Sequence, residues 1–255
     1  MNVCGTLRNL REMAVLLACL AAIVGALIVT GVAGGSNGLP IGRTPVKLDP
    51  ADFTVDIDNP YYPLRPGDRR VYRETAPDGT RHRIVDEVLN KTKLIANGVT
   101  ARVIRATVTN SAGKVVEYTE EWFAQDRAGN VWYFGEDTTK YENGKASKKG
   151  SFEAGVNGAQ PGVQMPAKPK AGMRFRLEGG YKTGAADHTV ILSVGREQVE
   201  VPSGHFRGTL MTRDYTPLEP TVSELWFYAK GVGAVLALDI SDGDHREELV
   251  SFRRG

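Results

Sequence analysis

The sequence predicts an all-β domain behind a single apolar N-terminal segment. From residue 52 onward, short runs with apolar residues at alternate positions are separated by turn signals such as Asn97-Gly98. This pattern is typical of antiparallel strands joined by tight turns. Glycine (29 residues) and proline (13 residues) are plentiful, and they interrupt every longer candidate helix beyond the leader.

The apolar segment comes first in the chain. Arg8 and Arg11 precede an uncharged run from Met13 to about Ala33, and roughly 20 apolar residues can span a bilayer as a helix. The arginines favour a cytoplasmic N-terminus, which places the domain on the extracytoplasmic side of a cell membrane. Two alternatives stay open: a signal anchor, or a signal peptide cleaved near Ala33 that leaves a secreted domain. We assign residues 1–35 to this leader and residues 36–51 to a flexible tether.

The first half of the domain contains six strand-forming runs. Its strongest hairpin signal is Asn97-Gly98 between two β-rich runs, and turns at residues 77–79, 112–113 and 126–130 separate the other runs. The runs cover residues 70–72, 81–89, 93–95, 99–109, 115–123 and 131–134.

The second half of the domain repeats landmarks of the first at an offset of about 105 residues. The matched pairs are Gly67 with Gly172, 95–98 with 201–204, 123–124 with 228–229, and 129–131 with 233–235. We therefore predict one domain, residues 52–255, built from two related antiparallel meanders at about 67–135 and 172–240. An isolated small sheet would leave one apolar face exposed to water. The two meanders should therefore pack together as a sandwich, or as a barrel or half-barrel.

A long connection, residues 136–171, lies between the two halves. Connections of this length without regular structure are uncommon and tend to be functional or disordered. Its tyrosine, methionine and proline content leads us to expect an ordered flap packed across one end of the sheets.

Several short motifs in the domain resemble a family of exported bacterial β-rich proteins, many of them lipoproteins, whose activity is unassigned. They are IDNPYYPL (57–64) followed by PG (66–67), WYFGEDT (132–138), YENG (141–144), GAQPG (158–162) and YAKGVG (228–233). The resemblance covers roughly residues 52–240 and implies a fold and a compartment, but no chemistry. The chain departs from it at Cys19, because the apolar run continues beyond that residue instead of ending at a lipid-modified cysteine.

Composition excludes several classes of site. A formal net charge of +2 argues against a nucleic-acid binder. Both cysteines, Cys4 and Cys19, fall in the leader, so the domain has no thiolate nucleophile or cysteine metal site. The histidines lack the spacing of metal ligands, and we expect them at the surface or rim; they are His82, His188, His205 and His245. We expect neither a cofactor nor a metal.

The best candidate ligand site is the end of the first half, where it enters the flap. Trp132 and Tyr133 are followed closely by Glu136 and Asp137. Aromatic rings beside a few polar groups at the mouth of a sheet suit a small-molecule or lipid pocket. The alternative is that the aromatic residues are core residues that anchor the flap.

Glu120 and Trp122 complete the candidate set. On the strand 115–123, one face carries Val116, Tyr118, Glu120 and Trp122. An acid among aromatic residues must be paired, hydrogen-bonded or placed at a cavity. Glu120 is therefore a candidate acid–base group, or the partner of Arg105 or Arg102 in a structural ion pair.

Three functions remain open at this stage. The one we favour is a non-enzymatic module that binds an apolar or amphipathic ligand, or an envelope partner, outside the membrane. The second is a hydrolase-type enzyme with a carboxylate-based site, although no catalytic motif names a reaction. The third is a structural envelope protein without a pocket. The N-terminal segment makes the membrane itself an expected partner.

Overall fold

The computed structural model describes residues 38–142, 144–241 and 245–255, and these residues confirm the all-β prediction. No α-helix occurs among them, and the 3-10 helix η2 covers Pro50–Asp52. The strands are β1 (Phe53–Thr54), β2 (Arg69–Thr75), β3 (Arg81–Leu94), β4 (Thr100–Asn110), β5 (Val115–Asp126), β6 (Val131–Glu142), β7 (Lys145–Ser147), β8 (Phe152–Glu153), β9 (Gly162–Met165), β10 (Arg174–Arg176), β11 (His188–Val201), β12 (Gly204–Thr216), β13 (Glu219–Ala229), β14 (Gly233–Asp239) and β15 (Arg246–Arg253).

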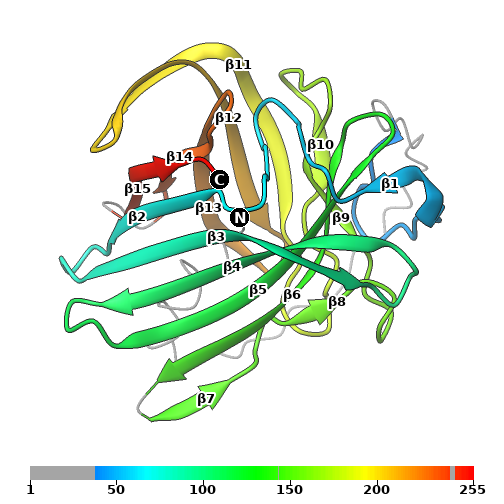
Figure 1. The fold of residues 1–255 in the computed structure, drawn as a ribbon, viewed down its shortest axis with the longest axis horizontal. Coiled ribbons are helices and arrows are strands. Elements are labelled where there is room, and N and C mark those ends of the chain that lie inside the picture. Colours follow the sequence, from blue (N-terminus) through cyan, green and yellow to red (C-terminus); the bar gives the residue numbers. More distant parts are fainter. Residues whose placement is uncertain (1–37, 143, 242–244) are drawn as a thin grey trace, which may run out of the picture.

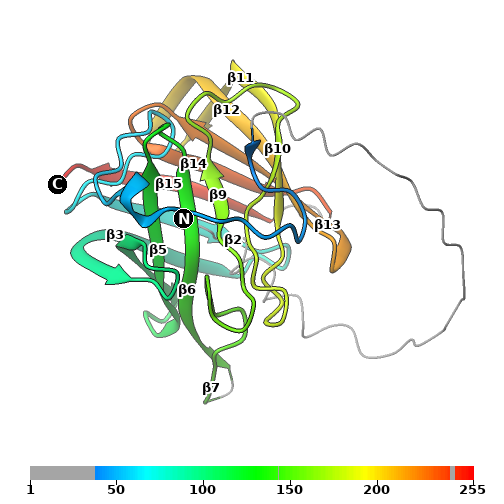
Figure 2. The same ribbon diagram turned by 90° about the vertical axis from the view of Figure 1, so that its right-hand side faces the viewer.

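All these strands belong to one open antiparallel sheet with the order β10-β11-β12-β13-β14-β15-β2-β3-β4-β5-β6-β7. The short strands β1, β8 and β9 pair with β5 or β6 beside this path. In Figures 1 and 2, β11 to β13 lie above β3 to β7, with β15 and β2 between them. The two meanders are thus joined edge to edge through β15, and the curvature of one sheet, instead of the stacking of two, covers the core.

The two meanders have the same internal arrangement. Strands β2 to β6 and strands β10 to β14 each form a five-stranded run in chain order. The N–H of Gly67 donates to the carbonyl of Val88 at 2.8 Å, and the N–H of Gly172 donates to the carbonyl of Ile191 at 2.8 Å. The two glycines have φ values of 91° and 87°. These parallels agree with the predicted duplication, which stays a prediction.

The turns that the sequence predicts in the first half of the domain are present in the structure. Gly79, Gly98, Gly113 and Gly129 all have positive φ between 76° and 91°, the conformation that glycine adopts without steric cost. The strand predicted to end near residue 89 instead continues to Leu94, because a bulge between Val88 and Thr92 absorbs the interruption.

The long hairpin tips bend back onto the molecule. In the β3–β4 tip, Ile95 and Val99 are fully buried. In the β11–β12 tip, the N–H of Ser203 donates to the carbonyl of Leu249 in β15 at 3.0 Å, and Figure 1 shows this tip curling over that side of the sheet. The tips therefore cover parts of the core that the curved sheet leaves open.

The two ends of the open sheet approach each other at β9 and β10. An isolated antiparallel bridge joins Gln160 to Gly179. The backbones are in close contact, since a Cβ at Gly162 would lie 1.9 Å from the carbonyl oxygen of Leu177. The predicted flap, residues 136–171, supplies the end of β6 and all of β7, β8 and β9, and brings the two edges together.

The segment at residues 57–64 packs into the hydrophobic core. Ile57, Tyr61, Tyr62 and Leu64 are all at most 5% exposed. The side-chain amide of the buried Asn59 donates to the carbonyls of Gly129 and Pro166 at 3.0 and 3.2 Å. Asn59 thereby connects the segment at residues 57–64 to the β5–β6 turn at Gly129 and to Pro166 directly after β9.

Residues 38–49 lie against the sheet through specific hydrogen bonds. The guanidinium of Arg176, which is fully buried, donates to the carbonyls of Gly42 and Thr44 at 2.8 and 2.9 Å. The backbone N–H of Arg176 donates to the carbonyl of Pro40 at 2.7 Å. This part of the expected flexible tether is therefore held against the sheet by hydrogen bonds.

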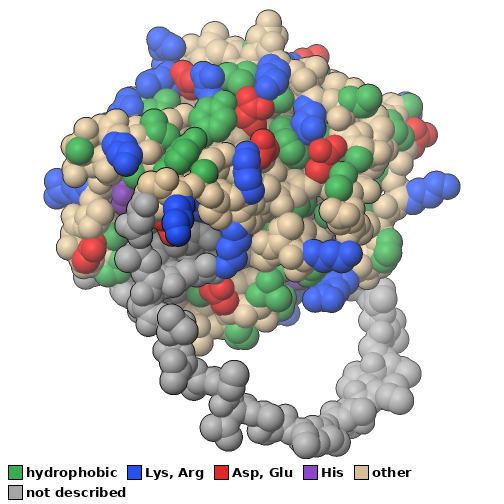
Figure 3. Space-filling view, turned by 90° about the horizontal axis from the view of Figure 1, so that it is seen from below, with side chains coloured by type: hydrophobic (Ala, Val, Ile, Leu, Met, Phe, Trp, Pro, Cys, Tyr) green, Lys and Arg blue, Asp and Glu red, His purple; other side chains and the backbone are tan. Residues whose placement is uncertain are grey.

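The predicted leader, residues 1–35, lies outside the described residues. Among the residues that are described, no helix has the length and apolar character needed to cross a membrane. On the face of the domain in Figure 3, lysine and arginine side chains are interspersed with acidic and apolar ones.

Candidate functional site

A pocket of about 620 Å³ lies where the flap and the two sheet ends meet. We call it the flap pocket. Its wall comes from the segment around Arg43, the end of β3, β5, β6, Ser151 and β8, the loop after β8, and the segment between β10 and β11. The lining residues are Arg43, Lys93, Trp122, Glu136, Asp137, Ser151, Phe152, Glu153, Val156, Asn157, Gly158, Ala159, Gln160, Gly179, Gly180, Tyr181, Lys182 and Thr183.

Phe152 forms the apolar floor, and two glycines make room for it. A Cβ at Gly135 would lie 2.1 Å from the carbonyl oxygen of Phe152, and a Cβ at Gly180 would lie 2.6 Å from its Cγ atom. Gly135 also has a φ of 125°, which side chains other than glycine rarely adopt. The ring of Phe152 packs edge-on against Tyr133 at 5.6 Å. The floor is therefore fixed by backbone contacts.

Trp122 lies on the wall beside a charged pair. The ammonium of Lys93 lies 4.5 Å from the centre of the indole ring and 3.1 Å from a carboxylate oxygen of Glu153. The other oxygen of Glu153 accepts the N–H of Ala96 at 2.8 Å, which ties the β3–β4 tip to the flap. The indole N–H of Trp122 is buried and has no acceptor among the described residues.

Glu136 provides a buried carboxyl group at the inner end of the pocket. Burial, and then the nearby charges of Glu121 and Glu117, raise its pKa to about 8, although Lys140 and a hydrogen bond from Tyr133 act in the opposite direction. The hydroxyl of Tyr133 donates to Glu136 at 3.1 Å. The raised pKa favours the protonated form of this carboxyl group, which can both donate and accept a hydrogen bond.

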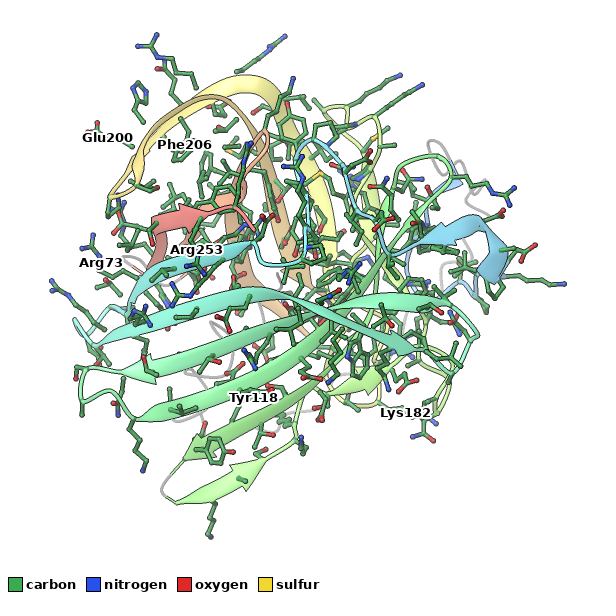
Figure 4. The ribbon with its side chains drawn as sticks, viewed as in Figure 1. Arg73, Tyr118, Lys182, Glu200, Phe206 and Arg253 are labelled. Atoms are coloured by element: carbon green, nitrogen blue, oxygen red, sulfur yellow. The ribbon has the colours of Figure 1, made fainter. Side chains whose placement is uncertain are left out.

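The rim carries acidic groups that are already paired and basic groups that are not. The ammonium of Lys148 lies 2.5 Å from Asp137. Arg43 lies over the ring of Tyr181 at 4.6 Å, and the hydroxyl of Tyr181 donates to the carbonyl of Gly42 at 2.7 Å. Within the described part of the chain, neither Arg43 nor Lys182 forms an ion pair. Figure 4 shows Lys182 extending from its turn below the ribbon. The rim therefore has an excess of free positive charge.

The structure brings three of the six predicted site residues together. Trp122, Glu136 and Asp137 all line the flap pocket. Tyr133 is buried directly beside it, where it holds Glu136 and stacks on Phe123 at 4.9 Å.

Trp132 and Glu120 lie elsewhere. Trp132 packs edge-on against Phe53 at 6.1 Å and donates its indole N–H to Asp126 at 2.8 Å, so it is a structural residue. Glu120 accepts the ammonium of Lys91 at 2.7 Å. Its partner is thus neither Arg105, which pairs with Glu87 at 2.6 Å, nor Arg102. Glu120 therefore forms an ion pair, with a cation other than the two that we expected.

Sequence reasoning missed most of the pocket residues. Phe152, Glu153 and Val156 fall in the predicted flap, but nothing in their spacing marks them individually. Arg43 and Lys182 reach the pocket from segments that no local pattern connects, because the contact depends on the two sheet ends meeting. The glycines at 135 and 180 are a usable signal, since each permits a close backbone approach.

The histidines differ from expectation in their exposure. His82, His188 and His245 are 4–8% exposed, so the prediction of surface or rim positions is wrong for these three. His205 is exposed and pairs with Gln198 at 3.2 Å. In the described residues, no group of three or more histidine, cysteine or acidic side chains is arranged to hold a metal ion.

Comparisons with known proteins identify neither a family nor a function for this chain. No family model matches the chain, and no curated protein matches it. Among solved structures, it is similar to one described as a "putative lipoprotein" from Parabacteroides distasonis ATCC 8503. That match has 12% sequence identity and a TM-score of 0.42, and it covers 76% of this chain and 99% of the other. A likeness this weak assigns neither a fold family nor a function.

Proposed function

We propose that this protein is a non-enzymatic binding protein that holds a small amphipathic ligand with an anionic group in the flap pocket. In this proposal the domain lies on the extracytoplasmic side of a cell membrane. The observation that carries it is the pocket itself, whose volume of about 620 Å³ falls in the usual range for ligand sites, roughly 300–1,000 Å³.

The apolar part of the ligand would lie against Phe152, Trp122 and Val156. The first two are rigid aromatic side chains held by the packing described above. Val156 is 40% exposed, so its apolar surface is available to a bound molecule. Burying such surface contributes about 25 cal/mol for each Å² removed from water.

The anionic group of the ligand would lie near Arg43 and Lys182. Neither has an ion-pair partner among the described residues, whereas the acidic groups Asp137 and Glu153 already pair with lysines. The carboxyl group of Glu136, which lines the pocket, supplies hydrogen bonds for further polar atoms. This arrangement supports a ligand with one anionic end and one apolar end.

A titration with 2-naphthalenesulfonate, an aromatic anion, tests the proposal. The full chain is placed in nanodiscs of zwitterionic phosphatidylcholine, and heat is measured by calorimetry against empty nanodiscs. We expect binding to the wild type, and affinity at least tenfold lower for Val156→Asp and for the double variant Arg43→Gln/Lys182→Gln. The aspartate would add an uncompensated charge to the apolar wall, and the glutamines would remove the cations.

Leu218→Asp is the matched control, because Leu218 is a comparably exposed apolar residue (46%) outside the pocket. It should bind the probe as the wild type does. Absence of binding to the wild type, or an equal loss for Leu218→Asp and Val156→Asp, would contradict the proposal.

A further inference from the structure

A second pocket, of about 430 Å³, lies between the first described residues and the loop that joins β9 to β10. We call it the lysine pocket. Its lining combines mostly apolar side chains with two lysines; the residues are Leu39, Ala128, Asn130, Pro166, Ala167, Lys168, Lys170 and Met173. No acidic residue is among them, whereas Glu136, Asp137 and Glu153 line the flap pocket. The lysine pocket therefore favours an anionic group.

The loop that carries the two lysines is held by hydrogen bonds near both of its ends. The N–H of Ala167 donates to the side-chain carbonyl of Asn130 at 2.8 Å, and the N–H of Met173 donates to the carbonyl of Lys170 at 3.1 Å. Lys168 and Lys170 are exposed, and neither forms an ion pair within the part of the chain that the structure describes. Two ammonium groups on a fixed loop are thus available to an anion.

The sequence around the lysine pocket carries the same sign of charge. Residues 38–48 contain two basic residues and no acid, and residues 154–177 contain four basic residues and no acid. These two stretches supply six of the eight lining residues. Asp126, two positions before Ala128, already accepts hydrogen bonds from Asn130. An anion in the pocket would therefore meet little repulsion from carboxylates.

The chain enters the domain beside this pocket. Pro40, which follows Leu39, accepts the N–H of Arg176 in β10 at 2.7 Å, and Figure 2 shows the described chain beginning beside β10. The apolar run ends at about residue 33, and the six residues from there to Leu39 reach at most roughly 20 Å when extended. The polar headgroup layer is itself about 5–7 Å thick on each side. When the leader stays in the membrane as a signal anchor, the pocket is therefore held close to the headgroups.

We propose that the lysine pocket binds the phosphate group of an anionic phospholipid in this membrane, with Lys168 and Lys170 as the partners of the phosphate. Lysine is a common ligand of phosphate, and basic residues beside a membrane segment are attracted to anionic lipids. The apolar wall of Leu39, Pro166 and Met173 suits the glycerol backbone and first methylene groups of a lipid, which a free phosphate ion lacks. The proposal shares with the flap pocket only the location of the domain outside the membrane.

Lysine acetylation in two kinds of nanodisc tests this site. The full chain is placed in phosphatidylcholine alone, or in equal amounts of phosphatidylcholine and phosphatidylglycerol, and a neutral acetylating reagent is followed by peptide mass spectrometry. We expect Lys168 and Lys170 to react at least fivefold more slowly in the anionic nanodiscs. Lys114 and Lys145 should react equally in both, because they lie at the opposite end of β5 and β6, roughly 40 Å along the 12 residues of β5.

Lys168→Gln separates a shared phosphate from a general effect of the charged surface. In this variant Lys170 should be acetylated at least threefold faster in the anionic nanodiscs than in the wild type, because one lysine holds a phosphate more weakly than two. Lys47→Gln is the matched control, since it removes an exposed positive charge from the stretch 38–48 outside the pocket. It should leave the rate at Lys170 unchanged, and both variants should melt at the wild-type temperature.

Three results would overturn the inference. They are equal acetylation of Lys168 and Lys170 in the two nanodiscs, an equal effect of Lys47→Gln and Lys168→Gln on Lys170, and protection of Lys170 in the zwitterionic nanodiscs by millimolar inorganic phosphate. The last result would show a site for free phosphate instead of a lipid. The measurement involves neither the flap pocket nor 2-naphthalenesulfonate, so the two proposals fail separately.

Discussion

At the scale of single residues, the structure differs from the sequence prediction mainly in which face of the sheet is buried. Along β5, the alternating pattern predicts a mainly apolar face that carries Tyr118, Glu120 and Trp122. The opposite face carries Thr119, Glu121 and Phe123, which are 0–4% exposed, whereas Tyr118, labelled in Figure 4, and Glu120 are only partly buried. Alternation predicts that two faces exist, but it cannot identify the buried face when that face itself contains acids.

Asp86→Asn provides the most direct test of a buried acid, because neither carboxylate oxygen of Asp86 has a hydrogen-bond partner among the described residues. At pH 7 the unfolded chain ionises Asp86, while the folded protein, with the pKa raised to about 8, must keep the proton or bury the charge. The amide removes this cost. We expect the free energy of unfolding in urea at pH 7 to increase by about 2 kcal/mol.

The gain for Asp86→Asn should disappear below about pH 3, under the ordinary aspartate pKa of 3.8, where both states of the wild type hold the proton. Glu87→Gln, at the neighbouring half-buried position, should lower stability slightly, because it loses its pair with Arg105. A loss of stability for Asp86→Asn at pH 7 would show that the carboxylate has a partner.

At the scale of elements, the sequence predicts the strands and turns of the first half well, because Asn-Gly and similar signals mark each hairpin. It does not predict β15, which closes the gap between the two meanders. That strand reads Arg-Glu-Glu-Leu-Val-Ser-Phe-Arg, in which two adjacent acids interrupt the alternation that marks the other strands. Its place in the sheet follows from pairing with β2 and β14, which no local pattern encodes.

Arg176→Ala tests how the segment at 38–49 is held. Removing this buried guanidinium leaves the carbonyls of Gly42, Thr44 and Pro161 without their donor. We expect a loss of about 3 kcal/mol in unfolding free energy and faster proteolysis within residues 38–49. Arg174→Ala is the matched control, because Arg174 is exposed on the same strand. Equal proteolysis of the two variants would contradict this role.

Gly135→Ala tests the β6–β8 contact that places Phe152. The Cβ would overlap the carbonyl of Phe152 and require a strained φ, so β8 must shift. We expect a loss of about 2–3 kcal/mol in stability and weaker binding of 2-naphthalenesulfonate. Gly113→Ala also places an alanine at positive φ (76°) but meets no neighbouring atom within 4 Å, and it should leave probe binding unchanged. If Gly135→Ala binds the probe normally, the floor of the pocket does not depend on this contact.

At the scale of the whole molecule, one open sheet bends until its ends meet, and the buried acids give it an unusual dependence on pH. The pKa values of Asp86 and Glu136 are raised to about 8, and that of Asp214 to about 7, mainly by burial. Acids with raised pKa values in the folded state contribute stability that is present at low pH and lost as pH rises through those values.

The melting temperature should therefore fall between pH 5 and pH 8. Below about pH 4 the opposite effect of Glu74, whose pKa is lowered, should reduce stability again. A scan of thermal unfolding in buffers of constant ionic strength measures both limbs. A melting temperature that rises steadily from pH 5 to pH 8 would contradict the buried, protonated state of these acids.

The central claim is that the flap pocket holds an amphipathic anionic ligand, and native mass spectrometry of the full chain from the membranes of its host tests it most directly. We predict that the wild type carries a noncovalently bound molecule with an acidic group, and that Val156→Asp, prepared identically, lacks it while Leu218→Asp retains it. A wild-type protein that is consistently empty, or a ligand that Val156→Asp retains in full, would contradict the claim.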